Sequence, residues 1–370
     1  MRSLLSPLAA VLALAGPWPA TAAPAAQARS GYLFNDAHFH LTNYVQKGLT
    51  VRQYVEMMGS TVKRSTLFGI PLQQHWSHAN SGDFAPTYYL QTDAPLYYYS
   101  FTDAAIAKAY LSLPERERAR LDPMITGFNP ADMYGVDHIR RVLETFPGVF
   151  TGIGEFSIHK EFVSAKIPGE TASLTNPALD RILDFAAETG LVVILHCDID
   201  MPFTKGRELP VYYRQMRELL ARHPRTTIIW AHTGLGRIVQ PIPVQASTEA
   251  APRPPGHIEL VESLLADPQL RHVYFDISWD EVAKYAVSSP QSIERVAAAF
   301  ERHPDRFLFG TDNVAPADLK GHLRVYEMWE PIFDRLNPAT KAAITMGNYE
   351  RLFDAARLRV REWERANVRD

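Results

Sequence analysis

Eight short apolar runs recur along the chain, separated by segments with helical periodicity. They span residues 34–38, 64–70, 124–128, 149–155, 191–196, 226–231, 273–277 and 306–310. Each run is continuous instead of alternating, which is typical of strands buried on both faces of a sheet. Strand, helix and strand at this spacing predict βα units with parallel pairing. We therefore expect an α/β fold in which eight parallel strands close into a (β/α)8 TIM barrel.

Helical patterns occupy most of the intervals between these runs. They span residues 177–189, 210–222, 257–266 and 292–302, and the segment 320–367 is also helical in pattern. Gly190 directly follows the first of them, and we expect it to end that helix as a C-cap.

Two stretches are longer than a minimal barrel needs. Residues 71–122 are rich in aromatic side chains, and we expect a long insertion between the second and third strands. Within it, the pattern of residues 96–101 leaves a strand or a loop open. Residues 239–256 are rich in Pro and Ala and predict a loop.

The first residues have the features of a secretory signal peptide. A basic residue precedes an apolar run at 4–15, and residues 20–22 and 26–28 both match the A-x-A cleavage pattern. The alternative, an uncleaved anchor, needs ~20 apolar residues, and prolines interrupt this run sooner. We therefore expect residues 1–28 to be cleaved, residues 29–370 to form a single domain, and the mature protein to be periplasmic or secreted, with no attachment to the membrane.

Composition sets few further limits. The chain has 370 residues, of which 46% are hydrophobic, so it can bury a core without disulfides. Its net charge of -3 gives no general attraction to nucleic acid, and a small-molecule substrate is the expected partner. The single cysteine, Cys197, is expected to be a buried structural thiol. The composition is compatible with a monomer or an oligomer.

Candidate metal ligands stand at the ends of the predicted strands. His38 and His40 are two residues apart, so in a strand their imidazoles share one face. Later runs finish on residue types that bind metals, namely Glu155, His196, His232 and Asp312. The carboxyl ends of parallel barrel strands converge on one face, which would bring these side chains into one place.

Each of these residues also has an ordinary structural explanation, such as a hydrogen-bonded core histidine or a turn cap. Those explanations would all have to hold together, whereas one metal site accounts for the whole set.

Because the first and last strands of a barrel are neighbours, we expect Asp312 beside His38 and His40. Nitrogen and oxygen donors without thiolate suit Zn, Mn, Fe or Ni, and we expect Zn. Six candidates fit either two ions bridged by Glu155, or one ion with some of the six acting as acid, base or substrate contact. Asp36 is expected to orient an imidazole.

These motifs together resemble the amidohydrolase superfamily, specifically the amidohydrolase-2 group of TIM-barrel metal-dependent hydrolases. The similar segments are DAHFH at 36–40, GIGEF at 152–156, ILH at 194–196, WAHTG at 230–234, FGTD at 309–312 and MGNYERLF at 346–353. The resemblance covers roughly residues 32–356 and identifies no substrate.

The resemblance implies a role for each strand-end residue. His38, His40 and His196 correspond to metal ligands, and His232 to a ligand or a substrate contact. Asp312 corresponds to a ligand that also carries a proton. Many two-metal members have a carboxylated lysine at the position of Glu155. Some members, including the TatD-like deoxyribonucleases, have a glutamate there, as this chain does. The resemblance therefore implies one or two ions.

The expected reaction is hydrolysis of an amide, lactone, ester or phosphoester, in which Asp312 takes a proton from a metal-activated water and His232 assists. One alternative is non-oxidative decarboxylation of an aromatic or unsaturated acid, with the tyrosines at 97–99 stacking on the acid. A TatD-like phosphodiesterase is a third reading, which the lack of a basic stripe disfavours. A binding protein on a degenerate barrel is a fourth, which the intact ligand set argues against.

Residues just after strand ends are the candidate substrate contacts. They are His159, Lys160, Arg237, Trp279 and Asn313. Of these, Lys160 or Arg237 is expected to hold a carboxylate.

Overall fold

The computed structural model describes residues 31–200, 209–237 and 256–368. The predicted signal peptide at 1–28 lies outside the described residues, as does all but the last residue of the predicted loop at 239–256. Among the described residues, none of the helices has the length and apolar composition that crossing a membrane requires.

The central element is a sheet of eight strands, and every neighbouring pair in it is parallel. In sheet order the strands are β1 (Phe34–Asp36), β3 (Val62–Leu67), β6 (Leu121–Ile125), β7 (Gly152–His159), β8 (Val192–Cys197), β9 (Ile228–Trp230), β10 (Val273–Asp276) and β11 (Phe307–Leu308). Each predicted apolar run overlaps one of them, and the prediction of eight parallel strands in chain order is confirmed.

The sheet curls, and residues just after its first and last strands are hydrogen-bonded to each other. The amide of Ala37, just after β1, donates to the carbonyl of Phe309, just after β11, at 3.0 Å. Beyond this point β2 (Phe39–His40) pairs in parallel with β12 (Asn313–Val314). The segments that follow β1 and β11 therefore pair with each other at the carboxyl end of the sheet.

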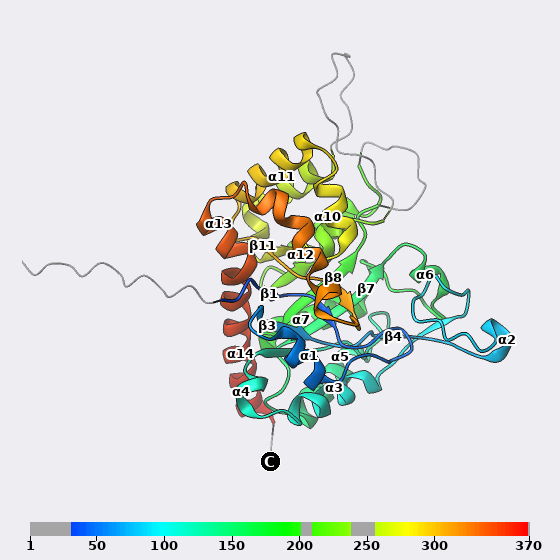
Figure 1. Cartoon of the computed structure of the whole chain (residues 1–370). Helices are drawn as coiled ribbons and strands as arrows, with labels where there is room; N and C mark the ends of the chain where they lie inside the picture. The colour runs from blue at the N-terminus through cyan, green and yellow to red at the C-terminus, as the bar shows by residue number, and fades with distance from the viewer. Residues whose placement is uncertain (1–30, 201–208, 238–255, 369–370) are drawn as a thin grey trace, which may run out of the picture. The chain divides into compact units, whose positions relative to one another are not determined.

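Helices pack around the sheet (Figure 1). They are α1 (Val51–Met58), α3 (Phe101–Leu111), α4 (Glu115–Arg118), α5 (Gly135–Thr145), α6 (Val163–Lys166), α7 (Pro177–Thr189), α8 (Tyr213–Arg222), α9 (His257–Leu265), η2 (Pro268–Leu270), α10 (Asp280–Ala286), α11 (Pro290–Arg302), α12 (Leu319–Phe333), α13 (Pro338–Ala342), η3 (Ala343–Gly347) and α14 (Asn348–Asn367). The helical patterns at 177–189, 210–222, 257–266 and 292–302 each correspond to one of them.

Helix α7 shows how local sequence sets these boundaries. The Asn176 side chain caps its first turn by accepting from the amide of Ala178, and Pro177 stands where no amide partner is needed. Gly190 ends it in the left-handed region at φ 83°, as the sequence predicts. A Cβ there would also lie 2.4 Å from the Cβ of Arg359, so glycine is needed for space as well.

Helix α14 packs across the amino ends of the strands. Its Tyr349 and Phe353 join an apolar cluster with Val192 and Ile194 on the inner face of the sheet. Tyr349 also donates to Asp122 at the start of β6, at 2.7 Å. This helix therefore fills the amino-terminal side of the inner face, which leaves the carboxyl ends of the strands for chemistry (Figure 1).

The aromatic-rich stretch at 71–122 contains a small antiparallel sheet. Strand β4 (Leu72–Gln74) pairs with β5 (Leu96–Tyr98), and α2 (His78–Ser81) lies between them in sequence. Of the two readings of residues 96–101, a strand is right for 96–98. Tyr89 of this stretch shares an apolar cluster with Val163, which follows β7, so the stretch lies near the carboxyl end of the sheet.

Candidate metal centre

The first group of predicted ligands meets where the first and last strands adjoin. The Nε2 atoms of His38 and His40 are 3.3 Å apart. His40 Nε2 lies 3.2 Å from Glu155 Oε2 and 3.3 Å from Asp312 Oδ1. Asp312 is therefore beside both histidines, as expected for neighbouring first and last strands. One donor atom from each of these four residues falls within 4.8 Å of the others.

A second group shares Glu155 with the first. His196 Nδ1 contacts Glu155 Oε1, and His232 Nε2 lies 3.5 Å from the same oxygen. His232 Nε2 is also 3.8 Å from Asp312 Oδ2. All six predicted side chains thus lie around one buried centre, arranged as two groups that have the Glu155 carboxylate in common.

Two backbone features differ from the sequence-based expectation. Glu155 does not end its strand, because β7 continues through register irregularities to His159. His232 and Asp312 both have left-handed backbones, with φ 56° and 51°. These residues lie in tight turns after β9 and β11, a conformation rare for residues with a side chain and frequent at functional sites.

The ring nitrogens of His38 and His40 that point away from the centre are held by acceptors. His38 Nδ1 donates to Asp276 Oδ2 at 3.0 Å, and His40 Nδ1 donates to the carbonyl of Gly69 at 3.3 Å. Because each Nδ1 is directed to an acceptor, Nε2 is the ring nitrogen that faces the centre.

Asp276 and Ser278 fix the third histidine in the same way. The Ser278 hydroxyl donates to Asp276 Oδ1, so its oxygen accepts from His232 Nδ1 at 2.9 Å. Asp276 Oδ1 also accepts from the backbone amide of His232 at 2.9 Å. The buried Nε2 of His232 has no hydrogen-bond partner and faces the centre as a lone pair.

A cation fits this assembly. Imidazole lone pairs and two carboxylates face one another around the centre, and acceptors without a donor between them repel. A divalent ion between these imidazoles and carboxylates would bind all of them at once. Zinc and similar ions bind nitrogen and oxygen ligands of this kind.

The electrostatics of the cluster favour a cation. Burial would raise the pKa of Glu155, but the charges of Lys160 and His196 lower it well below the usual range. Burial also opposes a charge on His38, yet Asp276 raises its pKa well above the usual value. Burial lowers the pKa of His232, although the charge of Asp312 acts in the opposite direction. An ion that binds here therefore displaces a proton from His38.

Asp36 accepts hydrogen bonds from the backbone and from the Thr311 hydroxyl, and not from the imidazole of His38 or His40 as expected; His322 Nε2 lies 3.6 Å from its Oδ2. Its carboxylate accepts from the amide of Thr311 at 2.9 Å and from the amide of His38 at 3.1 Å. Burial raises its pKa to about 6, although the bonds from Thr311 act in the opposite direction. Asp36 thus ties the turn before Asp312 to the first strand, while Asp276 orients the His38 ring.

Two of the predicted substrate contacts lie against the cluster. Lys160 Nζ is 3.5 Å from Glu155 Oε1. The Trp279 ring lies 5.3 Å from the His232 ring, centroid to centroid, and the Arg237 guanidinium packs over the same indole at 5.2 Å.

Two further predicted contacts, His159 and Asn313, point elsewhere. His159 is buried in β7 and packs on Tyr212, with ring centroids 4.5 Å apart. Asn313 donates to His322. Cys197 is fully buried in β8, which confirms the prediction of a buried thiol, and burial raises its pKa well above the usual value.

Sequence reasoning missed Asp276, Ser278, Asp198 and Tyr88. Asp276 ends the seventh strand, so the strand-end rule that found the other residues would also have found it. Asp198 Oδ1 accepts from His196 Nε2 at 2.9 Å, and the Tyr88 hydroxyl accepts from Arg237 at 2.8 Å. No sequence signal marks Ser278 or Tyr88.

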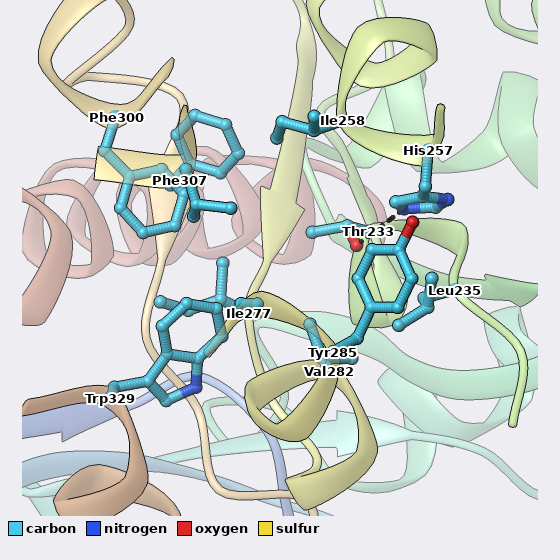
Figure 2. Close-up of a pocket in the computed structure, with 12 residues that line it drawn as sticks. Thr233, Leu235, His257, Ile258, Ile277, Val282, Tyr285, Phe300, Phe307 and Trp329 are labelled. Atoms are coloured by element: carbon cyan, nitrogen blue, oxygen red, sulfur yellow. Dashed lines mark hydrogen bonds between the residues drawn. The ribbon is translucent and has the colours of Figure 1, made fainter. Parts of the chain in front are cut away.

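A separate apolar cavity lies behind the turn that carries His232 (Figure 2). It is lined by Leu235, Ile277, Phe307 and Trp329, among others, and the imidazole of His257 donates to the Thr233 hydroxyl at its edge. Its volume of about 30 Å³ is enough for one or two water molecules. The cavity is a packing void beside the turn and is too small for a substrate.

Comparison with known proteins gives one match at the family level. The model of the family described as Amidohydrolase matches residues 36–355. No curated protein sequence matches the chain.

Solved structures of similar fold share little sequence with the chain. An amidohydrolase from Burkholderia multivorans with bound HEPES has 13% identity and a TM-score of 0.50, over 87% of this chain and 99% of that one. A protein described as a putative 2-pyrone-4,6-dicarboxylic acid hydrolase, from Pseudomonas putida, has 13% identity and a TM-score of 0.48, over 87% and 98%. Dihydroorotase from Campylobacter jejuni has 12% identity and a TM-score of 0.45, over 87% and 84%.

Proposed function

The chain belongs to the amidohydrolase family and is therefore an enzyme, and we propose that it is a metal-dependent hydrolase of an amide, lactone, ester or phosphoester bond in a small molecule. The observation that carries this proposal is the buried centre at which four imidazoles and two carboxylates meet. Its proposed ligands are His38, His40, Glu155, His196, His232 and Asp312. When bound, a divalent ion would lower the pKa of a water molecule and polarise the bond to be cleaved.

Asp312 is the proposed proton carrier. It is ionised, because His232 and His38 outweigh the effect of burial and lower its pKa. Its side chain retains 8% exposure, more than any other member of the cluster, so it meets an incoming molecule first. The carboxylate would take a proton from the attacking water and return it to the leaving group, a step worth ~100-fold in rate or more.

His232 is proposed as a ligand or proton acceptor. Because its Nδ1 proton is directed to Ser278, its Nε2 offers a lone pair to the centre and not a hydrogen-bond donor. It is therefore unsuited to polarising a substrate carbonyl by donating a hydrogen bond.

The same proposal includes the closure of the sheet, the identity of the metal ion and the cleavage of the signal peptide. We propose that the curled sheet is a closed (β/α)8 barrel with a long insertion after its second strand, supported by the contact of Ala37 with Phe309. Zinc is the proposed ion, in one or two copies, because the donors are nitrogen and oxygen. The proposal retains a cleaved signal at 1–28 and a mature periplasmic or secreted domain at 29–370, supported by the sequence pattern alone.

Replacing Asp312 tests the reaction. The metal-loaded enzyme is screened on lactones, esters, amides and phosphoesters, and Asp312→Asn is expected to lower turnover of the best substrate ~100-fold or more. The variant should keep its fold and most of its metal, because the other ligands remain. Asp305→Asn, at an exposed position before the same strand, is the matched control and should be fully active. Full activity of Asp312→Asn would contradict the proposed role of Asp312. If the enzyme releases CO2 from acids and hydrolyses none of the substrates, the proposed hydrolase is instead a decarboxylase.

A further inference from the structure

The turn that carries Asp312 has a backbone that its own residues do not favour. Asp312 and Ala315 both have positive φ, at 51° and 47°, and neither is a glycine. A left-handed backbone is costly for a residue with a side chain, so it persists only where neighbouring groups hold it in place. The contacts on either side of Asp312 therefore decide where its carboxylate lies.

Asp36 holds the side of the turn that precedes Asp312. Its carboxylate accepts from the amide of Thr311 at 2.9 Å and from the Thr311 hydroxyl at 2.7 Å. The amide of Asp312 itself donates to the carbonyl of His38 at 2.8 Å. This side of the turn is thus fixed to β1 and to the segment just after it.

The side chain of Asn313 holds the other side of the turn. Its Nδ2 donates to the carbonyl of His322, in α12, at 3.0 Å, and it also lies 3.0 Å from Nδ1 of the same residue. Because a carbonyl only accepts, the atom at this position is the amide nitrogen of Asn313 and not its amide oxygen. An amide nitrogen only donates, so Nδ1 of His322 is the acceptor and the single proton of the neutral ring is on Nε2.

His322 is a buried polar side chain among aromatic rings. It is fully buried, and the rings of Phe34, Phe39 and Tyr54 pack near it, with centroids 6.2, 5.6 and 5.7 Å from that of the imidazole. Burial lowers the pKa of His322 to about 4, so the ring is neutral at pH 7. In such surroundings an apolar ring would be less costly to bury than an imidazole, so the polar atoms of His322 need a reason of their own.

Both ring nitrogens of His322 face groups that flank Asp312. Nδ1 accepts from Asn313, which directly follows Asp312. Nε2 lies 3.6 Å from Oδ2 of Asp36, an electrostatic contact and not a hydrogen bond, and the same oxygen accepts from the Thr311 hydroxyl. One buried ring thus links the contacts that hold the turn before and after Asp312.

We propose that Asn313 and His322 are positioning residues that hold the Asp312 carboxylate at the candidate metal centre. The imidazole keeps the Asn313 side chain in place, and Asn313 in turn keeps the turn in its left-handed conformation. The inference rests on the proposed function, in which Asp312 is a ligand and the proton carrier. It places Asn313 behind the reacting groups and replaces the substrate contact expected from the sequence.

The test compares zinc affinity with stability in the purified chain. Zinc affinity is measured by competition with a chromogenic chelator, and stability by urea unfolding of the metal-free protein. His322→Phe keeps the aromatic packing and removes the acceptor, so zinc affinity should fall about 10- to 100-fold with little change in the unfolding midpoint. Asn313→Leu removes the donor at a half-buried position and should have the same effect.

Further variants separate the proposed contact from a general disturbance. His322→Asn places an amide oxygen near the position of Nδ1 and should retain most of the zinc affinity. His303→Phe makes the same replacement as the first variant at a half-buried position after α11, and it should bind zinc as the wild type does. In an Asp312→Ala background, His322→Phe should cause no further loss, because the carboxylate that it positions is absent.

Several outcomes would overturn the inference. One is unchanged zinc affinity in His322→Phe and Asn313→Leu, including a fall in the unfolding midpoint alone, which is what a merely structural role would give. Another is further loss of affinity from His322→Phe in the Asp312→Ala background, because the ring would then not act through Asp312. An equal loss in His322→Asn would show that the acceptor is unimportant. If His322→Phe does not fold, Asn313→Leu decides. A wild-type chain that binds no zinc would instead overturn the proposed function.

Discussion

Each histidine in the cluster has one ring nitrogen at the centre and the other held by a hydrogen-bond partner. The partners are Asp276 for His38, Gly69 for His40, Asp198 for His196 and Ser278 for His232. Such partners set the tautomer and the orientation of a metal-binding imidazole before the ion arrives. The arrangement therefore supports metal binding independently of the family match.

Ser278 offers the sharpest test of this arrangement. Ser278→Ala removes the acceptor for His232 Nδ1 and frees the ring to change tautomer, so metal affinity should fall about 10- to 100-fold. Ser278→Thr keeps the hydroxyl and should restore the affinity. The affinity is measured by competition with a chromogenic chelator, and nitrogen-15 NMR of labelled histidines reports the tautomer. A Ser278→Ala protein with an unchanged His232 tautomer would refute the role of Ser278.

At the scale of residues, the sequence could predict that the six candidate ligands lie together, but not most of their hydrogen-bond partners. The six candidate ligands follow from one rule about strand ends, and Asp276 obeys the same rule. Ser278 owes its position to a turn and Tyr88 to the aromatic-rich stretch at 71–122, and both bring together segments that are far apart in sequence. Asp36 was assigned to a ring and instead holds two backbone amides, a difference that depends on backbone geometry.

Among the elements, the turn after β9 has three consecutive residues in the left-handed region of the backbone. His232, Thr233 and Gly234 in η1 (Ala231–Gly234) all have positive φ, at 56°, 55° and 72°. The Thr233 hydroxyl donates to the His232 carbonyl, and the Trp230 indole lies directly against Gly234. The turn presents His232 to the centre, and its conformation depends on a glycine at its end.

Replacing that glycine should destabilise the protein. A Cβ at Gly234 would lie 2.7 Å from two atoms of the Trp230 ring, in addition to the strain of a positive φ. We expect Gly234→Ala to lower the free energy of unfolding by about 2–5 kcal/mol. Gly169→Ala is the control, because Gly169 has φ 88° but open space around it, and it should cost only about 1–2 kcal/mol. Urea unfolding measures both, and equal losses would mean that contact with Trp230 is unimportant.

The elements themselves were predictable where burial leaves a clear pattern. All eight strands are recognisable because a strand covered on both faces is apolar throughout. The extension of β7 to His159 was missed because its last residues, Ser157 to His159, are not a simple apolar run. Strands β4 and β5 have three residues each, too few for a periodic signal.

In the molecule as a whole, the packing of α14 and the candidate metal centre lie at opposite ends of the sheet strands. Helix α14 packs with the inner face at the amino ends of the strands, and the candidate metal centre occupies the carboxyl ends. Curling of the sheet brings Asp312 beside His38, which no local pattern could show. The fold was still predictable, because the order and spacing of the strands require that proximity. The family resemblance drawn from short motifs is also confirmed, and the substrate was not predictable because those motifs describe only the metal centre.

The metal content of the purified protein tests the central claim most directly. After reconstitution with zinc and removal of excess metal, elemental analysis of the wild type should find one or two equivalents per chain. Glu155→Ala should lose them, because both ligand groups share this carboxylate. Glu144→Ala, at an exposed position in α5, should retain them. A wild-type chain without bound metal, or a Glu155→Ala chain that keeps its full complement, would contradict the assignment of this cluster as a metal centre.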